Sequence, residues 1–217
     1  MLDDKETLER YIRPTPTPYF TPAKIPNKLI GKIGFVSDLF GSGIRVYVVD
    51  PDGSHLALLT SPWPYQSMRN REWISPDGRY VVYQGGSQDR LDLYLKPLNG
   101  GPHHRLTFVG TGQAYDPAWS PDGQRIVFAS NQEGDDDIFV VTFGDPEHPN
   151  PHTEKLTRGD DWQSDKHPSY SPDGTQIVYY SNATGSEQIW IMNADGSNRR
   201  PLIELDARCW DPVWFKP

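Results

Sequence analysis

The chain has 217 residues, enough for one sizeable domain with a buried core. A formal net charge of −8 and a pI near 5.2 argue against a nucleic-acid-binding protein, and no apolar run approaches the roughly 20 residues that cross a bilayer. The single cysteine, Cys209, excludes an intrachain disulfide, while 19 glycines, 21 prolines and 12% aromatic residues are typical of an all-β protein with many turns.

The first 28 residues are predicted to lie outside the main domain. Residues 3–12, DDKETLERYI, favour about three helical turns because their acidic residues come first and Arg10 comes late. Prolines at positions 14, 16, 18, 22 and 26 then predict an extended arm or linker. We therefore assign residues 1–28 to a helix with a Pro-rich arm, and residues 29–217 to the folded domain.

Three copies of Ser-Pro-Asp-Gly divide the folded domain into units. They begin at Ser75, Ser120 and Ser171, with separations of 45 and 51 residues. Each copy precedes an apolar run of strand length, a polar turn, a second apolar run and a short closing run. Proline fixes the first corner of a turn, and Asp and Gly accept the geometry that follows. Each unit therefore predicts a four-stranded antiparallel meander, with this motif connecting the first and second strands.

The two ends of the domain each carry part of a further unit. Residues 32–60 contain the second, third and fourth strands of the pattern but no first strand. The chain ends on CWDPVWFKP, residues 209–217, which is a first strand without its Pro-Asp-Gly. Together they make one complete unit, so the C-terminal strand is expected to pair with the N-terminal segment and act as a latch.

These residues resemble a known repeat. The phrase DPAWSPDGQRIVFASNQEGDDDIFVV, residues 116–141, is similar to the TolB-type β-propeller repeat, a WD-like repeat built around Pro-Asp. The resemblance covers about residues 29–217 and implies blades whose innermost strand precedes the Ser-Pro-Asp-Gly motif. It implies little about chemistry, because one fold hosts many functions.

The repeats predict an all-β propeller of four blades, closed by the C-terminal latch. The blades are 32–60 plus 211–215, 71–107, 116–157 and 167–203. The alternative is a head-to-tail dimer of eight blades, in which each chain completes the open blade of the other. A monomer is favoured, and the two arrangements differ in particle mass.

Alignment of the units places one polar residue per blade at the start of the inner strand. In a closed ring, these residues would meet at the mouth of the axial channel: Arg71, Asp116, His167 and Asp211. Asp116, His167 and Asp211 could hold a cation, and Arg71 could hold an anion. Alternatively, the four side chains pair with one another around a hydrated channel. No cofactor is predicted beyond such a cation.

The connectors from each outer strand to the next inner strand are rich in aromatic residues. They are predicted to form a partner-binding face: Trp63, Tyr65, Tyr115, Trp162, Trp210 and Arg208. Rigid rings beside polar groups suit protein recognition. The alternative is that several rings pack between blades, as predicted for Trp119, Tyr170 and Trp214. The acidic triplet 135–137 falls in a hairpin turn and is predicted to be solvated.

Two functions remain open. The first is a non-enzymatic binding or scaffold propeller that recognises a protein or peptide, without nucleic-acid binding or membrane insertion. The second is a small-ligand or metal-binding propeller, with lactonase-like or lyase-like chemistry at the axial mouth. The first is favoured because the sequence has no GxSxG nucleophile motif. The Thr-Pro run is reminiscent of envelope-anchored bacterial proteins, so an extracytoplasmic location is expected, although no signal peptide is visible.

Overall fold

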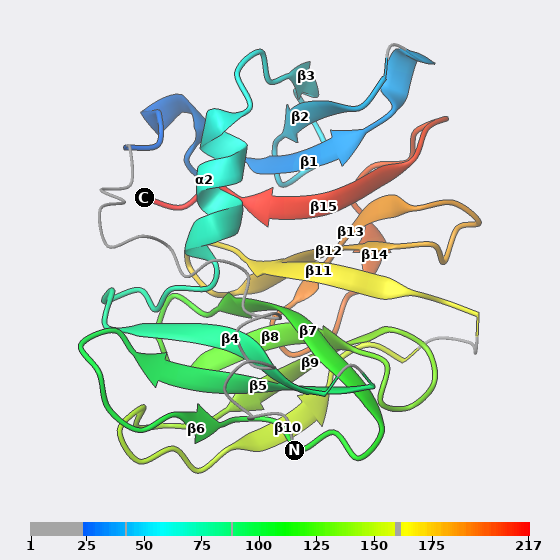
Figure 1. Ribbon diagram of the computed structural model, residues 1–217. Coiled ribbons are helices and arrows are strands. Elements are labelled where there is room, and N and C mark those ends of the chain that lie inside the picture. The colour runs from blue at the N-terminus through cyan, green and yellow to red at the C-terminus, as the bar shows by residue number, and fades with distance from the viewer. Residues whose placement is uncertain (1–23, 42, 88, 159–161) are drawn as a thin grey trace.

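A computed structural model describes residues 24–41, 43–87, 89–158 and 162–217. These residues form an all-β fold of three sheets with one α-helix (Figure 1). Residues 1–23, which hold the predicted N-terminal helix and most of the Pro-rich arm, lie outside this part of the chain. The described residues include no helix with the length and apolar character needed to span a bilayer.

The first sheet joins the two ends of the domain. Its strands, in spatial order, are β15 (Cys209–Trp214), β1 (Ile33–Ser37), β2 (Arg45–Val49) and β3 (Ala57–Leu58). The C-terminal strand β15 runs antiparallel to β1, with Trp214 opposite Ile33. The predicted pairing of the C-terminal strand with the N-terminal unit is therefore present.

The other two sheets contain the three Ser-Pro-Asp-Gly units. The last unit makes a four-stranded meander of β11 (Asp165–Tyr170), β12 (Gln176–Ser181), β13 (Gln188–Asn193) and β14 (Arg200–Pro201). The remaining sheet has seven strands: β4 (Tyr80–Ser87), β5 (Arg90–Pro97), β6 (His104–Arg105), β7 (Gly112–Trp119), β8 (Arg125–Ser130), β9 (Asp137–Thr142) and β10 (His152–Lys155). Within it, β5 runs parallel to the start of β7 and joins two units.

The three Ser-Pro-Asp-Gly motifs form the predicted turns. In the copy at 120–123, the Ser120 hydroxyl donates to Asp122 at 2.5 Å and accepts the backbone N–H of Arg125 at 3.0 Å. Gly123 has φ +71°, a conformation that a glycine adopts without steric cost. The copies at 75 and 171 repeat the same bonds. Local turn chemistry therefore fixes each connection between an inner strand and its neighbour.

The predicted inner strand of the second unit is much shorter than expected. Residues Trp63–Arg71 form the helix α2, and the expected pairing with β4 is limited to a bridge from Ile74 to Val81 and two backbone hydrogen bonds beside it. Pro64 is tolerated in the first turn, where its missing N–H has no intrahelical partner to lose. Tyr65 and Met68 form a buried face that packs against Val213 and Phe215 of the latch. Burial of this face stabilises a helix here in place of a strand.

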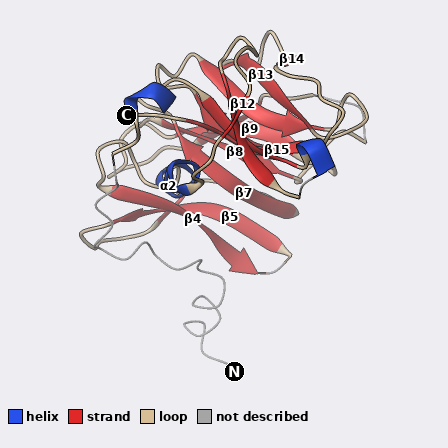
Figure 2. Cartoon of the chain, turned by 90° about the horizontal axis from the view of Figure 1, so that it is seen from above, coloured by secondary structure: helices blue, strands red, loops and turns tan. Residues whose placement is uncertain are grey.

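The sheets pack through large side chains on their inner strands. Strand β11 lies between β15 and β7, as Figure 1 shows. Trp119, Tyr170 and Trp214 occupy one repeat position and are buried in three different core clusters, as predicted. Figure 2 looks down α2, which lies beside the sheets rather than within one. The described strands do not join into a closed ring, so the number of blades and ring closure stay predictions.

Candidate functional site

Three inner strands share an unusual backbone feature at the same position. Asp116, His167 and Asp211 have φ angles of +50°, +51° and +53°, in the left-handed region that non-glycine residues seldom adopt. In β7, β11 and β15, the strand pairing shifts register at these residues, and each is followed by a proline. Such bulges redirect a side chain out of the regular alternation. The same distortion therefore turns three polar side chains toward one another.

The three redirected side chains form a continuous ion-paired network. His167 lies in the middle, with Nε2 at 2.8 Å from Asp116 Oδ2 and Nδ1 at 3.0 Å from Asp211 Oδ1. The ring of Tyr180 lies 5.5 Å from the imidazole, measured between ring centroids. The side chains are only 17 to 29% exposed. The predicted meeting of these three residues is therefore seen, while their role in binding a ligand stays a prediction.

The charge of His167 is set by opposing influences. Burial is the largest influence and favours the neutral imidazole, but hydrogen bonds to Asp116 and Asp211 outweigh it. The pKa of His167 is consequently raised above 6.5. A protonated imidazole can donate from both nitrogens, one to each carboxylate. In its protonated form, His167 thus lies between two carboxylates.

This arrangement predicts a stability loss at higher pH. Because the folded-state pKa of His167 is raised, its stabilising contribution is complete below 6.5 and disappears as the pH rises through the folded-state pKa. We expect the free energy of unfolding to decrease as the pH rises above about 6.5 and the decrease to be smaller in His167→Gln. Urea unfolding at several pH values would measure both slopes. Identical slopes in the parent protein and in His167→Gln would contradict the conclusion that the raised pKa of His167 contributes to stability.

The fourth predicted member of the axial set is placed differently. Arg71 is the last residue of α2, and its guanidinium donates to the main-chain oxygen of Pro217 at 3.1 Å. Arg69, one helical half-turn earlier, lies instead against His167, with 2.5 Å between Nη2 and Nδ1. The placement of Arg71 in the axial network is therefore wrong, because the helix turns it toward the C-terminal end. Arg69 adds a positive charge that lowers the pKa of His167.

The predicted cation is not supported by the geometry of the described residues. Among them, no three His, Cys, Asp or Glu side chains are grouped so that they could hold a metal ion. Asp116 and Asp211 direct their carboxylates at the imidazole, so the imidazolium occupies the place that a cation would take. A bound metal at this position stays a prediction.

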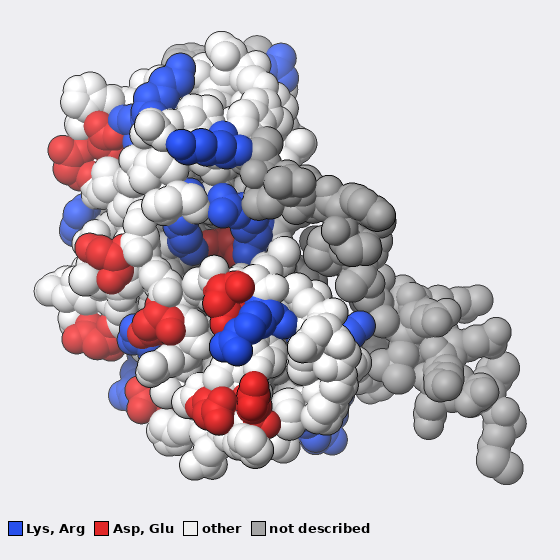
Figure 3. Space-filling model, turned by 90° about the vertical axis from the view of Figure 1, so that its left-hand side faces the viewer, with Lys and Arg blue, Asp and Glu red and all other residues white. Residues whose placement is uncertain are grey.

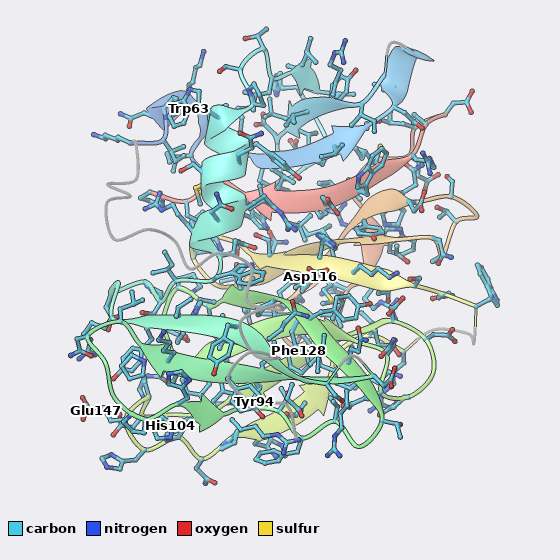
Figure 4. The ribbon with its side chains drawn as sticks, in the orientation of Figure 1. Trp63, Tyr94, His104, Asp116, Phe128 and Glu147 are labelled. Atoms are coloured by element: carbon cyan, nitrogen blue, oxygen red, sulfur yellow. The ribbon has the colours of Figure 1, made fainter. Side chains whose placement is uncertain are left out.

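The aromatic connector residues are distributed between surface and interior. Trp63 and Trp162 are 39% and 57% exposed, and Trp210 is half-buried beneath the guanidinium of Arg208, 5.3 Å from its ring. Tyr65 is buried and donates to the backbone oxygen of Asp211, so its assignment to the partner-binding face is wrong. Figure 4 shows Trp63 at the upper end of α2, well away from Asp116. The predicted residues therefore do not form one continuous aromatic patch.

Tyr115 belongs to a polar cluster that was not predicted. Its hydroxyl donates to Asp136, which also accepts Ser164 Oγ at 3.0 Å and pairs with Lys166 at 2.8 Å. Burial acts to raise the pKa of Asp136, but these bonds lower it overall. Asp137 is also buried, with Lys155 at 2.6 Å. The solvated turn predicted at 135–137 is thus wrong for these two aspartates, which fasten the turn to neighbouring strands.

Comparison with known proteins identifies the fold family. Residues 28–216 match the TolB beta propeller domain. This chain belongs to the TolB β-propeller domain family. The repeat resemblance seen in the sequence is therefore confirmed, and the three sheets with their inner strands β7, β11 and β15 are elements of a TolB-type propeller.

Individual relatives support this placement of the TolB-type domain. An uncharacterized protein of Agrobacterium fabrum is 29% identical over 144 residues, which cover 66% of this chain and 46% of the relative. The Tol-Pal system protein TolB of Anaeromyxobacter dehalogenans is 28% identical over 123 residues, which cover 57% of this chain and 26% of that protein. The crystal structure of TolB from Acinetobacter baumannii has a TM-score of 0.55 and 20% sequence identity. The similarity covers 86% of this chain and 44% of that structure. The chain thus spans less than half the length of these proteins.

Proposed function

We propose that this TolB-type domain is a non-enzymatic binding module that recognises a protein or peptide through its connectors. The observation that carries the proposal is the location of the exposed aromatic rings. Among the described tryptophan and phenylalanine residues, the exposed rings are those of Trp63, Phe108 and Trp162, and each lies between an outer strand and the next inner segment. Exposed aromatic rings supply rigid contact area and are enriched at protein interfaces.

Phe108 and Trp162 are the best placed of the three. Phe108 lies between β6 and β7, and Trp162 lies between β10 and β11, so they occupy equivalent connectors of adjacent units. Their side chains are 67% and 57% exposed. Arg105 stacks on Phe108, with its guanidinium carbon 4.7 Å from the ring centroid. An exposed ring held by a neighbouring cation is ordered before binding, which lowers the entropy cost of a contact.

The axial network supports binding rather than catalysis as the role of this domain. Both ring nitrogens of its histidine are paired with carboxylates, so neither is free to take a proton from a substrate. The one cysteine, Cys209, is buried, and burial raises the pKa of its thiol to about 11. A thiol with that pKa is a weak nucleophile.

Replacement of the two exposed rings should weaken partner binding without unfolding the domain. We expect Phe108→Ala with Trp162→Ala to reduce binding by at least about tenfold, since central aromatic contacts are typically worth 2 kcal/mol or more. Photo-crosslinking from position 108, in an envelope extract of the source organism, would identify the partner, and titration would give the affinities. Leu98→Ala is the matched control, because Leu98 is 45% exposed but lies in the turn after β5. Equal losses in both variants would contradict the proposal.

The names of the relatives bear on where a partner of this domain would be found. One relative is named as a Tol-Pal system protein, and the relatives reported above come from bacteria. We therefore propose an extracytoplasmic protein or peptide as the partner and a monomeric domain as the binding unit. The net charge of −8 favours a partner surface with basic character.

A further inference from the structure

Strand β4 has an open edge where a propeller blade would carry its inner strand. One side of β4 pairs with β5 along its whole length, from Tyr80 to Ser87. On the other side, the described chain supplies only the short segment Trp73–Ser75, which reaches as far as Val82. In the two complete meanders this position is filled by β7 and β11. Helix α2 occupies part of the sequence where the inner strand is expected, but it does not pair with β4.

The backbone groups on this edge can be identified from the bonds that are made. The backbone oxygen of Tyr80 accepts the N–H of Ser75 at 2.9 Å, and the N–H of Val82 donates to Trp73 at 2.8 Å. Successive strand residues direct their backbone groups to opposite sides, so Gln84 and Gly86 face the same edge as Tyr80 and Val82. No described segment forms backbone hydrogen bonds with the edge beyond Val82, and the contact there is a side-chain bond, from Gln84 Nε2 to the backbone oxygen of Ala114 in β7 at 3.2 Å. Two donors and two acceptors therefore lie in register for a further strand.

Strand β4 itself lacks the residues that normally discourage strand addition. Natural edge strands are usually interrupted by charged residues, proline or a covering segment. The sequence of β4, YVVYQGGS, contains neither a charge nor a proline. Gly85 and Gly86 are required by the hairpin of β4 and β5 itself, since a Cβ at Gly86 would collide with the backbone oxygen of Arg90 and a Cβ at Gly85 would lie 3.0 Å from the ring of Tyr94. An unprotected edge of this kind is suited to accept an extended peptide.

The corresponding position in the next unit shows what the incoming strand would resemble. There, Ala114 and Tyr115 pair with Ser130 and Ala129, which lie 45 residues after Gly85 and Gln84. Ala114 is fully buried, and Tyr115 is half-buried. The latch strand repeats this pattern with Cys209 and Trp210. A fitting segment therefore has a small side chain opposite Gly85, followed by a large one opposite Gln84.

We propose that the open edge of β4 binds an extended segment of a partner protein, which adds as an antiparallel strand beside Gln84–Ser87. The proposal deepens the peptide-recognition function proposed above and rests on it. A partner segment fits better than the chain's own N-terminal residues, because residues 3–12 favour a helix, and prolines at 14, 16, 18, 22 and 26 lack the N–H groups that pairing requires. Backbone pairing supplies the affinity, and the small-then-large pattern supplies the selectivity.

A synthetic peptide that copies residues 112–117, Gly-Gln-Ala-Tyr-Asp-Pro, provides the probe. Titration of the fluorescently labelled peptide into the full chain is expected to show saturable binding. Gln84→Pro should weaken it by about tenfold, because proline removes an edge-facing N–H but no bond to β5. Gln84→Ala also loses the side-chain bond to Ala114 but keeps the backbone N–H, so it serves as the matched control, with binding expected within about twofold of the parent. Equal binding by both variants, or no binding to the parent, would overturn the proposal.

Hydrogen exchange gives a second measurement that does not depend on the proline variant. The amides of Gln84 and Gly86 should exchange rapidly in the free chain and slowly with the peptide bound. Protection of both amides in the free chain would show that the chain's own residues or a second copy occupy the edge, and would overturn the proposal. If no crosslinks form from position 108 while the peptide still binds, the result would contradict the proposed connector surface but not the proposal for the β4 edge.

Discussion

Replacing Glu72 with alanine is expected to lower the free energy of unfolding by about 3 kcal/mol, because it removes the partner of a largely buried ion pair. The Glu72 side chain is only 3% exposed. Its Oε1 accepts Lys216 Nζ at 2.7 Å and Ser169 Oγ at 2.8 Å. Without the carboxylate, Lys216 would be left at 19% exposure with no acidic partner among the described residues.

Two further variants separate the contributions at this site. Glu72→Gln keeps the size and one acceptor oxygen but loses the charge, so it should cost about half as much as the alanine variant. Glu133→Ala removes an exposed partner of Lys155, at 3.0 Å, and should cost less than about 1 kcal/mol. Urea unfolding at pH 7 would measure all three. A loss at Glu72 no greater than that at Glu133 would show that the buried pair contributes nothing to stability.

Glu72 explains how the domain stays ordered although the inner strand of its second unit is so short. It follows α2 directly, while Ser169 belongs to β11 and Lys216 follows β15. The backbone oxygen of Glu72 also accepts the N–H of Trp119 in β7, at 3.2 Å. On this side of the molecule, Figure 3 shows Lys and Arg side chains around a hollow with an acidic side chain at its floor. One residue thus connects the helix to three inner strands or their ends.

The parts of the fold that could be predicted are those fixed by local chemistry. The turn at Ser120–Gly123 is closed by bonds between residues at most five apart, so its sequence alone determines its shape. The latch could be predicted because a complete pattern was divided between the chain ends. The convergence of Asp116, His167 and Asp211 followed from their equivalent positions in the repeats, although their left-handed backbone was not foreseen.

The prediction of a full inner strand in the second unit was wrong because this unit differs from the repeat. In three units, the polar residue at the inner strand precedes a proline, whereas Arg71 precedes Glu72. This difference removes the signal for the bulge and was visible in the sequence. The role of Glu72 was not visible, because its partners Ser169 and Lys216 are separated from it by 97 and 144 residues. No local pattern reports contacts at that distance.

Truncating Trp214 to alanine is expected to release the latch and lower the free energy of unfolding by about 4 kcal/mol. The ring is 3% exposed and packs in the core cluster that contains Ile33, Val49 and Ile191. Its backbone N–H donates to Ser169 at 3.0 Å, which joins the latch to the adjacent sheet. Loss of the ring would leave a cavity between two sheets that relax only partly, so the cost includes lost burial and lost packing.

Trp214→Phe tests whether packing or hydrogen bonding holds the latch. The indole N–H of Trp214 is buried and has no hydrogen-bond partner among the described residues, so phenylalanine removes no bond. It should therefore cost about 1 to 2 kcal/mol, well below the alanine variant. Urea unfolding gives these energies, and hydrogen exchange of the β1 amides reports separation of β15 before global unfolding. If alanine and phenylalanine destabilise equally, or if β1 keeps its protection in the alanine variant, Trp214 does not hold the latch closed.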